Sequence, residues 1–116
     1  MTEKDFRAIF NTLERTSSGH LPLIECRSGL KMSVQASDFN YCSPRTDLED
    51  ITGYYEFEVG FPTEKVEDLM YYAEDADKPT DTVYGYVPFY VIQKVIEDNG
   101  GQVNIGSVRN SNVFLA

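Results

Sequence analysis

The chain has 116 residues and a formal net charge of −9 at pH 7. This length suits one domain over residues 1–116, and 41% hydrophobic with 13% aromatic residues suits a folded core rather than a disordered acidic tail. The sequence has no apolar run long enough for a membrane span. Its charged first residues lack the apolar centre of a signal peptide, so we expect a cytoplasmic protein with reduced cysteines.

The negative charge is concentrated in the middle of the chain. Residues 47–81 hold twelve acids and two lysines, a net charge of −10, whereas the remainder carries +1. Such a segment repels phosphates, so we expect no direct nucleic-acid binding. It suits a protein partner with a basic surface. The simpler interpretation is a solvated face that only maintains solubility.

The first third of the chain predicts a helix and a hairpin. Residues 3–15 follow a helical apolar pattern after Thr2, which can cap a helix. A strand over 21–27, a Ser28–Gly29 turn and a second strand over 30–36 form an expected β-hairpin. The strand-like alternation of the second strand is carried by Leu30, Met32, Val34 and Ala36.

Residues 37–52 show no regular period and are rich in turn formers. They also contain Phe39, Tyr41 and Cys42. Because long loops with aromatic residues often pack against the domain and carry function, we expect a packed loop here.

The stretch from Gly53 to Phe61 predicts the central strand. Side chains alternate across a strand, so one face is expected to bury Tyr55, Phe57, Val59 and Phe61. The opposite face would then display Tyr54, Glu56 and Glu58. The same strand is thus expected to build the core and to present carboxylates.

The second half of the chain predicts two helices around one strand. The spacing indicates a short helix over 64–72, an acidic loop over 74–81, a strand over 82–87 and a helix over 88–98 that Asn99-Gly100-Gly101 ends. Two more strands are expected over 102–108 and 112–115. The resulting fold class is α+β: a mostly antiparallel sheet of four to five strands, with an N-terminal helix and one or two further helices packed on one face.

Three stretches resemble parts of catalytic or metal-binding sites, but none of them forms a complete site. The Cys42 loop has its arginine too close to the cysteine to wrap a phosphate, and no histidine lies nearby to activate the thiol. The acids from Asp75 to Asp81 lack the glycine and glutamate of a calcium loop. Glu56 and Glu58 form a carboxylate pair on one strand face. We therefore expect a non-enzymatic protein with no catalytic residue, metal or cofactor.

Tyrosines interleaved with the acids suggest a protein-binding surface instead. Tyrosine offers a large, rigid and amphipathic contact area, as protein interfaces require. The alternative is that these are core tyrosines with hydroxyls at the rim. The expected partner-binding residues are Tyr54, Glu56, Glu58, Glu67, Asp68, Tyr71, Tyr72, Glu74, Asp75 and Asp77.

Several short pieces resemble a set of small uncharacterised accessory proteins of enterobacterial phages and prophages. They are Met32–Ser37, Tyr41–Arg45, Val59–Pro62, Thr82–Pro88 and Asn99–Gly101. The pieces are turns, strand ends and helix caps, so the resemblance implies a context and no catalytic residue. It implies a non-enzymatic accessory protein that binds and inhibits a host protein, such as a CRISPR effector or another defence nuclease.

Two alternatives to an inhibitor remain open from the sequence. The first is a phage particle or morphogenesis component, for which self-association matters and a homodimer is one form. The second is a small hydrolase that uses the Cys42 loop or the Glu56 and Glu58 pair. The inhibitor hypothesis expects the −10 segment to mimic nucleic acid, with Tyr54 as an anchor and the strand acids more important than those of a mobile loop over 74–81.

Overall fold

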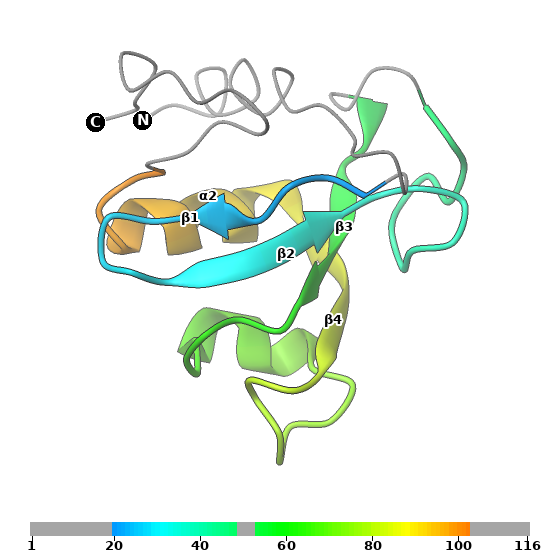
Figure 1. Ribbon diagram of the computed structural model, residues 1–116. Helices are drawn as coiled ribbons and strands as arrows, with labels where there is room; N and C mark the ends of the chain where they lie inside the picture. Colours follow the sequence, from blue (N-terminus) through cyan, green and yellow to red (C-terminus); the bar gives the residue numbers. More distant parts are fainter. Residues whose placement is uncertain (1–19, 49–52, 103–116) are drawn as a thin grey trace.

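The computed structural model describes residues 20–48 and 53–102. The helix expected over residues 3–15 lies outside these residues, as do the positions from 103 onward of the expected C-terminal strands. Within the described part, the architecture is a four-stranded antiparallel sheet, a 3₁₀-helix and one α-helix, in agreement with an α+β arrangement (Figure 1). No helix in this part is long and apolar enough to cross a membrane.

The sheet has the order β1-β2-β3-β4, and every neighbouring pair is antiparallel. Its strands are β1 (Ile24–Glu25), β2 (Lys31–Gln35), β3 (Glu56–Gly60) and β4 (Val83–Pro88). The expected hairpin is confirmed as β1 and β2. Its turn has three residues, 27–29, and Gly29 adopts the positive φ of 98° that such a turn requires.

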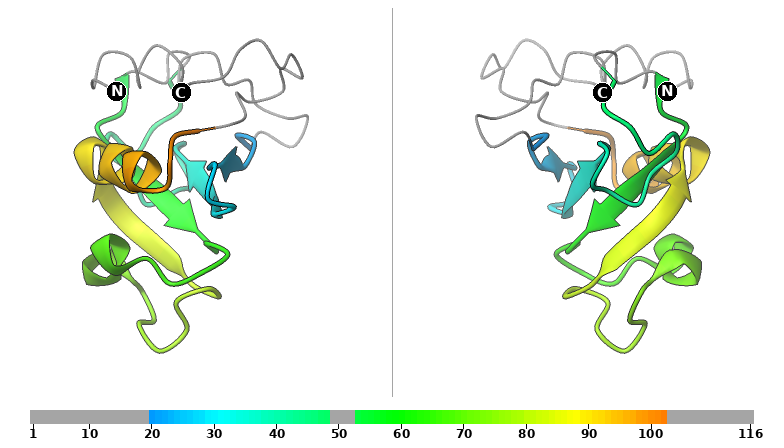
Figure 2. Two further views of the ribbon diagram at one scale, coloured as in Figure 1. Left: turned by 90° about the vertical axis from the view of Figure 1, so that its left-hand side faces the viewer. Right: turned by 90° about the vertical axis from the view of Figure 1, so that its right-hand side faces the viewer.

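Helix α2 (Phe89–Asp98) and the 3₁₀-helix η2 (Glu67–Tyr72) lie on the same side of β3 and β4, as Figure 2 shows. The α2 residues Phe89, Ile92, Val95 and Ile96 are buried against the sheet, and the Phe89 ring lies 5.8 Å from that of Phe57. The predicted stop is confirmed: after Asp98, Gly100 and Gly101 take positive φ and donate hydrogen bonds back to Glu97 and Ile96. Burial of this apolar stripe is what fixes the helix to the sheet.

Strand β3 corrects part of the predicted alternation. Phe57 and Val59 are fully buried as expected, but Tyr55 and Phe61 are more than half exposed and Tyr54 is fully buried. The regular strand begins only at Glu56, because the chain bends at Tyr55, so the alternation does not extend back to Tyr54. At the other end, Phe61 has a φ of 49° and turns out of the strand.

The helix expected over 64–72 is shorter and of another type. It is the 3₁₀-helix η2, and it begins only at Glu67. Thr63, just before the expected start, pairs instead with Lys31 through two hydrogen bonds of 2.9 and 3.0 Å. Leu69 is the one residue of η2 that is fully buried. A single buried residue suits one or two short turns packed against β4, whereas an amphipathic α-helix would bury a whole face.

Strand β4 carries a β-bulge. Phe57 pairs with Val87, whereas Val59 pairs with Tyr84, so β4 has one more residue than β3 between the two pairs. Tyr86, within the bulge, has a φ of 53°, which is rare for a bulky side chain. The bulge turns the Tyr86 side chain outward, away from the core that α2 covers.

Candidate partner-binding surface

The acids of the central strand hold a loop. The loop comprises residues 37–48 and is called the pinned loop below. Both carboxylate oxygens of Glu58 accept hydrogen bonds from it: Oε2 from the Tyr41 backbone N–H at 2.9 Å, and Oε1 from Asn40 Nδ2 at 3.1 Å. Hydrogen bonds to an ionised carboxylate are the stronger kind, so Glu58 is a main anchor of this loop.

Glu56 anchors the next part of the same loop. Its Oε1 accepts a hydrogen bond of 2.6 Å from Ser43 Oγ, and the Glu56 carbonyl accepts the Ser43 N–H at 3.1 Å. The Ser43 carbonyl in turn accepts the Tyr55 N–H, and Ser43 and Glu56 form an isolated antiparallel bridge. Glu56 and Glu58 are half-buried and engaged within the molecule, so they are not free acids for a partner.

Tyr54 supports the C-terminal end of the pinned loop through its hydroxyl group. Its hydroxyl donates to the Thr46 carbonyl at 2.6 Å and accepts the Leu48 N–H at 2.8 Å. Its ring is fully buried and lies 6.0 Å from the Phe57 ring. The expected surface anchor is therefore wrong: Tyr54 is a core residue whose polar end supports a loop.

The thiol of Cys42 also faces into the pinned loop. Cys42 is buried, and its Sγ donates to the Ser37 carbonyl at 3.1 Å. Cys26 is buried at the turn end of the hairpin and forms no disulfide with Cys42. Burial raises the pKa of the Cys26 thiol from 9.0 to about 11. The buried setting of Cys26 therefore disfavours the thiolate nucleophile.

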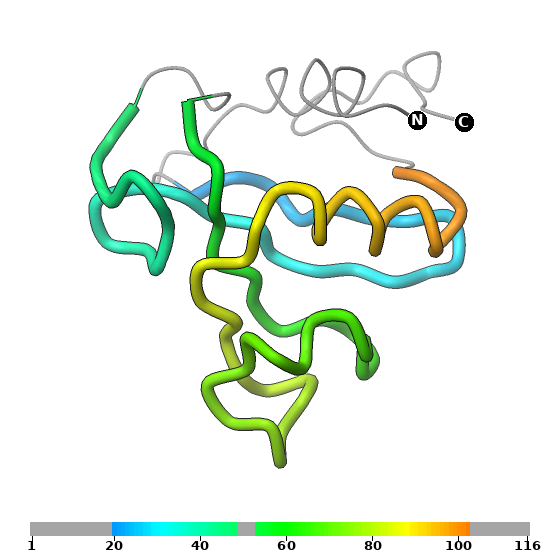
Figure 3. The backbone as a smooth tube through the Cα atoms, turned by 180° about the vertical axis from the view of Figure 1, so that it is seen from behind, coloured from blue at the N-terminus to red at the C-terminus, as the bar shows by residue number. Residues whose placement is uncertain are grey.

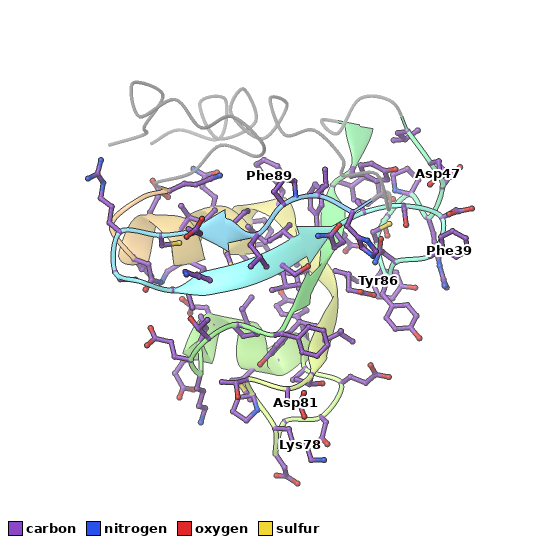
Figure 4. The ribbon with its side chains drawn as sticks, in the orientation of Figure 1. Phe39, Asp47, Lys78, Asp81, Tyr86 and Phe89 are labelled. Atoms are coloured by element: carbon purple, nitrogen blue, oxygen red, sulfur yellow. The ribbon has the colours of Figure 1, made fainter. Side chains whose placement is uncertain are left out.

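The loop that follows η2 lies at the lower end of the molecule in Figure 3. This loop, Glu74–Thr82, is called the acidic tip. The side chains of Glu74, Asp75, Asp77 and Asp81 are all exposed. Figure 4 shows Asp81 and Lys78 at its end.

The backbone of the acidic tip is held by several hydrogen bonds. Asp75 accepts the Asp77 N–H through Oδ1 at 3.1 Å and the Lys78 N–H through its carbonyl at 3.1 Å. The Asp75 N–H donates to Thr82 Oγ1 at 3.0 Å. Below the loop, the buried Tyr84 hydroxyl donates to the Pro79 carbonyl, and burial raises the pKa of Tyr84.

A group of tyrosines lies on η2, which leads into the acidic tip, and at the start of α2. Tyr71 is 90% and Tyr90 70% exposed, and the Tyr71 and Tyr72 rings meet edge to face at 5.1 Å. Burial first, and then the nearby Tyr90, Tyr71 and Glu56, raise the pKa of Tyr72. Large exposed rings among carboxylates give the contact chemistry that protein interfaces use.

The η2 acids are partly neutralised by lysines. Lys65 lies 3.3 Å from Glu67, and Lys94 of α2 lies 3.0 Å from Asp68 and 2.6 Å from Asp98. The carboxylates of Asp98 and Asp68 raise the pKa of Lys94. These exposed ion pairs reduce the net negative charge of η2. The negative electrostatic potential is therefore stronger at the acidic tip than at η2.

The structure divides the ten expected binding residues into two groups. Tyr54, Glu56 and Glu58 support the pinned loop from within. The remaining seven lie on η2 and the acidic tip, and they are Glu67, Asp68, Tyr71, Tyr72, Glu74, Asp75 and Asp77. Sequence reasoning missed Asp81 and Tyr90 as site residues, although Asp81 ends the same acidic run and Tyr90 follows the strand that closes it.

Within the described residues, no group of three or more His, Cys, Asp or Glu side chains is arranged to hold a metal ion. The acids of the tip instead accept backbone N–H groups or point to solvent. Comparisons with protein-family models, with curated proteins and with solved structures gave no match. The chemistry of the surface therefore has to be argued from its own residues.

Proposed function

We propose that this protein is a non-enzymatic binding protein that docks on a basic surface of another protein through η2 and the acidic tip. The observation that carries the proposal is the fixed backbone of the tip, from which exposed carboxylates project. Residues 64–81 hold seven acids and two lysines, a net charge of −5. Carboxylates that project from a hydrogen-bonded backbone have less conformational freedom to lose on binding, so more of their electrostatic attraction contributes to affinity.

The tyrosines beside the tip supply the apolar part of the contact. Tyr71 is exposed on this surface, next to Tyr72 and close to Asp68 on η2. A rigid ring surrounded by acids suits a basic surface whose arginine or lysine side chains have apolar stems and can lie over a ring face. Tyr71 therefore takes the anchoring role that the sequence assigned to Tyr54.

The resemblance to phage and prophage accessory proteins supports a host protein as the partner. We propose an inhibitor that acts in the cytoplasm of the bacterial host and covers a surface that normally holds nucleic acid. A defence nuclease such as a CRISPR effector has a surface of this kind, since such effectors hold their guide and target in a positively charged channel. Carboxylates on the acidic tip would occupy positions that phosphates normally fill.

Two variants that each lose two charges, used as baits to capture a partner from a lysate, test the proposal. The variant Glu74→Gln/Asp77→Asn removes two charges from the tip, and Glu25→Gln/Glu97→Gln removes two charges outside the proposed surface. We expect wild type and the second variant to retain the same basic protein from an enterobacterial lysate at low salt, and the tip variant to lose it. Retention by the tip variant, or equal loss by both variants, would contradict the proposal.

Inhibition requires its own measurement. The captured protein, once purified, is assayed for its nucleic-acid binding with and without wild type, the tip variant and the matched control. We expect wild type and the control to compete with nucleic acid, and the tip variant to compete less well. Simultaneous binding of nucleic acid and this protein would show that the tip does not occupy the phosphate sites.

A further inference from the structure

A second group of exposed rings lies on the pinned loop and β4. Phe39 is 82%, Tyr86 43% and Tyr41 39% exposed. These three side chains are called the aromatic patch. Figure 4 shows Phe39 and Tyr86 on one side of the molecule, apart from Lys78 and Asp81 at the acidic tip. Clustered rings of this size on a surface mark an interaction site more often than single exposed residues do.

The aromatic patch is assembled by specific contacts. The Tyr41 and Tyr86 ring centroids are 6.0 Å apart, and the Arg45 guanidinium lies 5.2 Å from the Tyr41 ring centroid. Arg45 Nη2 also donates to the Phe39 carbonyl at 3.2 Å. These contacts bring residues from two parts of the chain into one fixed surface.

The backbone under the patch is held in an unusual conformation. Tyr86, at its φ of 53°, donates its N–H to the Tyr41 carbonyl at 2.9 Å. A Cβ added at the neighbouring Gly85 would lie 3.2 Å from Tyr41 Cβ, so the loop packs closely on the bulge. Backbone outliers of this kind cluster at functional sites, and this one directs an aromatic ring to the surface.

The charges around the patch are self-complementary. The cation Arg45 contacts the Tyr41 ring and the Phe39 carbonyl. The exposed Asp38 and Asp47 belong to the same loop, where Asp47 Oδ1 accepts the Asp38 N–H at 3.0 Å. In a twofold interface, a contact between one residue of the first copy and another residue of the second occurs again with the two copies exchanged. An arginine and an aspartate within one patch can therefore pair reciprocally between two copies.

We infer that the aromatic patch is the interface of a homodimer, in which a second copy of this chain covers Phe39, Tyr41 and Tyr86. Arg45 of each copy then pairs with Asp38 of the other, while the rings pack between these two ion pairs. Exposed aromatic residues and arginine are the side chains most enriched at interface centres. A dimer through this patch joins two chains of net charge −9 where each offers a cation, and away from the acidic tip. The inference does not depend on the proposed function, since no basic partner is involved.

Sedimentation velocity over a concentration series, up to millimolar chain, tests this directly. We expect the wild type to form dimers and Phe39→Ser to weaken self-association by about tenfold or more, as loss of a central interface residue does. The matched control is Tyr71→Ala, which removes a 90% exposed ring outside the patch and should leave the dimer unchanged. A wild type that stays monomeric throughout, or a dimer that only Tyr71→Ala disrupts, would overturn the inference.

Charge reversal tests the reciprocal pairing. Arg45→Glu alone and Asp38→Lys alone should each be largely monomeric, because like charges then face each other across the twofold. An equimolar mixture of the two variants should form a heterodimer. In one of its ion pairs the two substituted side chains carry opposite charges, and in the other the native Asp38 faces the native Arg45. Circular dichroism of each variant establishes that it is folded. Failure of the mixture to associate, or weaker capture of a basic partner by Phe39→Ser with no change in self-association, would show that the patch does not serve a second copy.

Discussion

Two groups of carboxylates, both in the acidic segment, have opposite roles in this molecule. Glu58 on β3 accepts two hydrogen bonds from the pinned loop and Glu56 accepts one from Ser43, so these charges are used to hold the fold together. The acids of the tip face solvent from a backbone that is fixed by other groups. The location of an acid, on a strand or in a loop, therefore does not decide whether it is free for a partner. Its hydrogen-bond donors decide that.

The largest expected effect comes from Tyr54, which belongs to the supporting group. Tyr54→Ala should lower the free energy of unfolding by about 4 kcal/mol, because it leaves a cavity beside Phe57 and removes both hydrogen bonds to the pinned loop. Tyr71→Ala, at an exposed position, should change it by less than about 0.5 kcal/mol. Urea unfolding of both variants measures the difference. Equal effects would mean that Tyr54 does not belong to the core.

Glu58 should show the next largest effect. Glu58→Ala leaves the Tyr41 N–H and the Asn40 amide without their carboxylate, so we expect a loss of about 2–3 kcal/mol in unfolding free energy. The pinned loop should also become more accessible to protease. The matched variant Glu74→Ala removes the same side chain from the tip and should stay within about 0.5 kcal/mol of wild type. A stable Glu58→Ala variant with a protected loop would remove the distinction between the two groups.

Titration of Cys26 should lower the unfolding free energy of the protein at high pH. Its folded pKa of about 11 lies above the unfolded value of 9.0, because burial favours the neutral thiol. Its contribution to stability is therefore complete below pH 9 and is lost as the pH rises toward 11. Cys26→Ala should flatten the decline of unfolding free energy in this range. An unchanged decline would show that other groups cause it.

The raised pKa of Cys26 also predicts that its thiol reacts slowly in the folded protein. At pH 8 the fraction of Cys26 thiolate in the folded protein should be about a hundredfold below that of the unfolded chain, since two pKa units separate the states. Alkylation of Cys42→Ser, which leaves Cys26 as its one thiol, should accelerate by at least this factor on denaturation. Rapid labelling under native conditions would contradict the burial of this residue.

The smallest effect on stability is expected at the tip itself. Asp77→Asn should leave the unfolding free energy within about 0.5 kcal/mol of wild type, because the Asp77 side chain is exposed and its N–H remains bonded to Asp75. It should nevertheless weaken binding of a nona-arginine peptide in low salt, and the effect should fade as salt screens the charges. Fluorescence titration at two salt concentrations measures this. A binding loss that is independent of salt would exclude a simple charge contribution.

The sequence was sufficient where one local pattern decides the structure. The alternation of Met32 with Val34, the stripe of α2 and the glycines after Asp98 predicted the hairpin, the helix and its end. The β3 prediction was right for Phe57 and Val59, whose alternation lies within the regular strand. These features depend on neighbours in sequence and on burial of one face.

The sequence was insufficient where the deciding partner is distant. Glu58 and its donor Tyr41 are 17 residues apart, and Glu56 and Ser43 are 13 apart. A charge pattern cannot show that such donors will be present, so both acids were assigned to the surface. Tyr54 was misplaced because a single bend at Tyr55 ends the alternation, and a bend of one residue has no periodic signal.

Two properties of two variants, Glu56→Gln/Glu58→Gln and Glu74→Gln/Asp77→Asn, separate the strand acids, which hold the fold, from the tip acids, which we propose bind a basic partner. The properties are unfolding free energy in urea and affinity for nona-arginine in low salt. We predict that the strand variant loses about 2 kcal/mol or more of stability while the folded protein keeps most of its affinity, and that the tip variant does the reverse. A strand variant that loses affinity while its stability is unchanged, together with a tip variant that binds like wild type, would contradict the account.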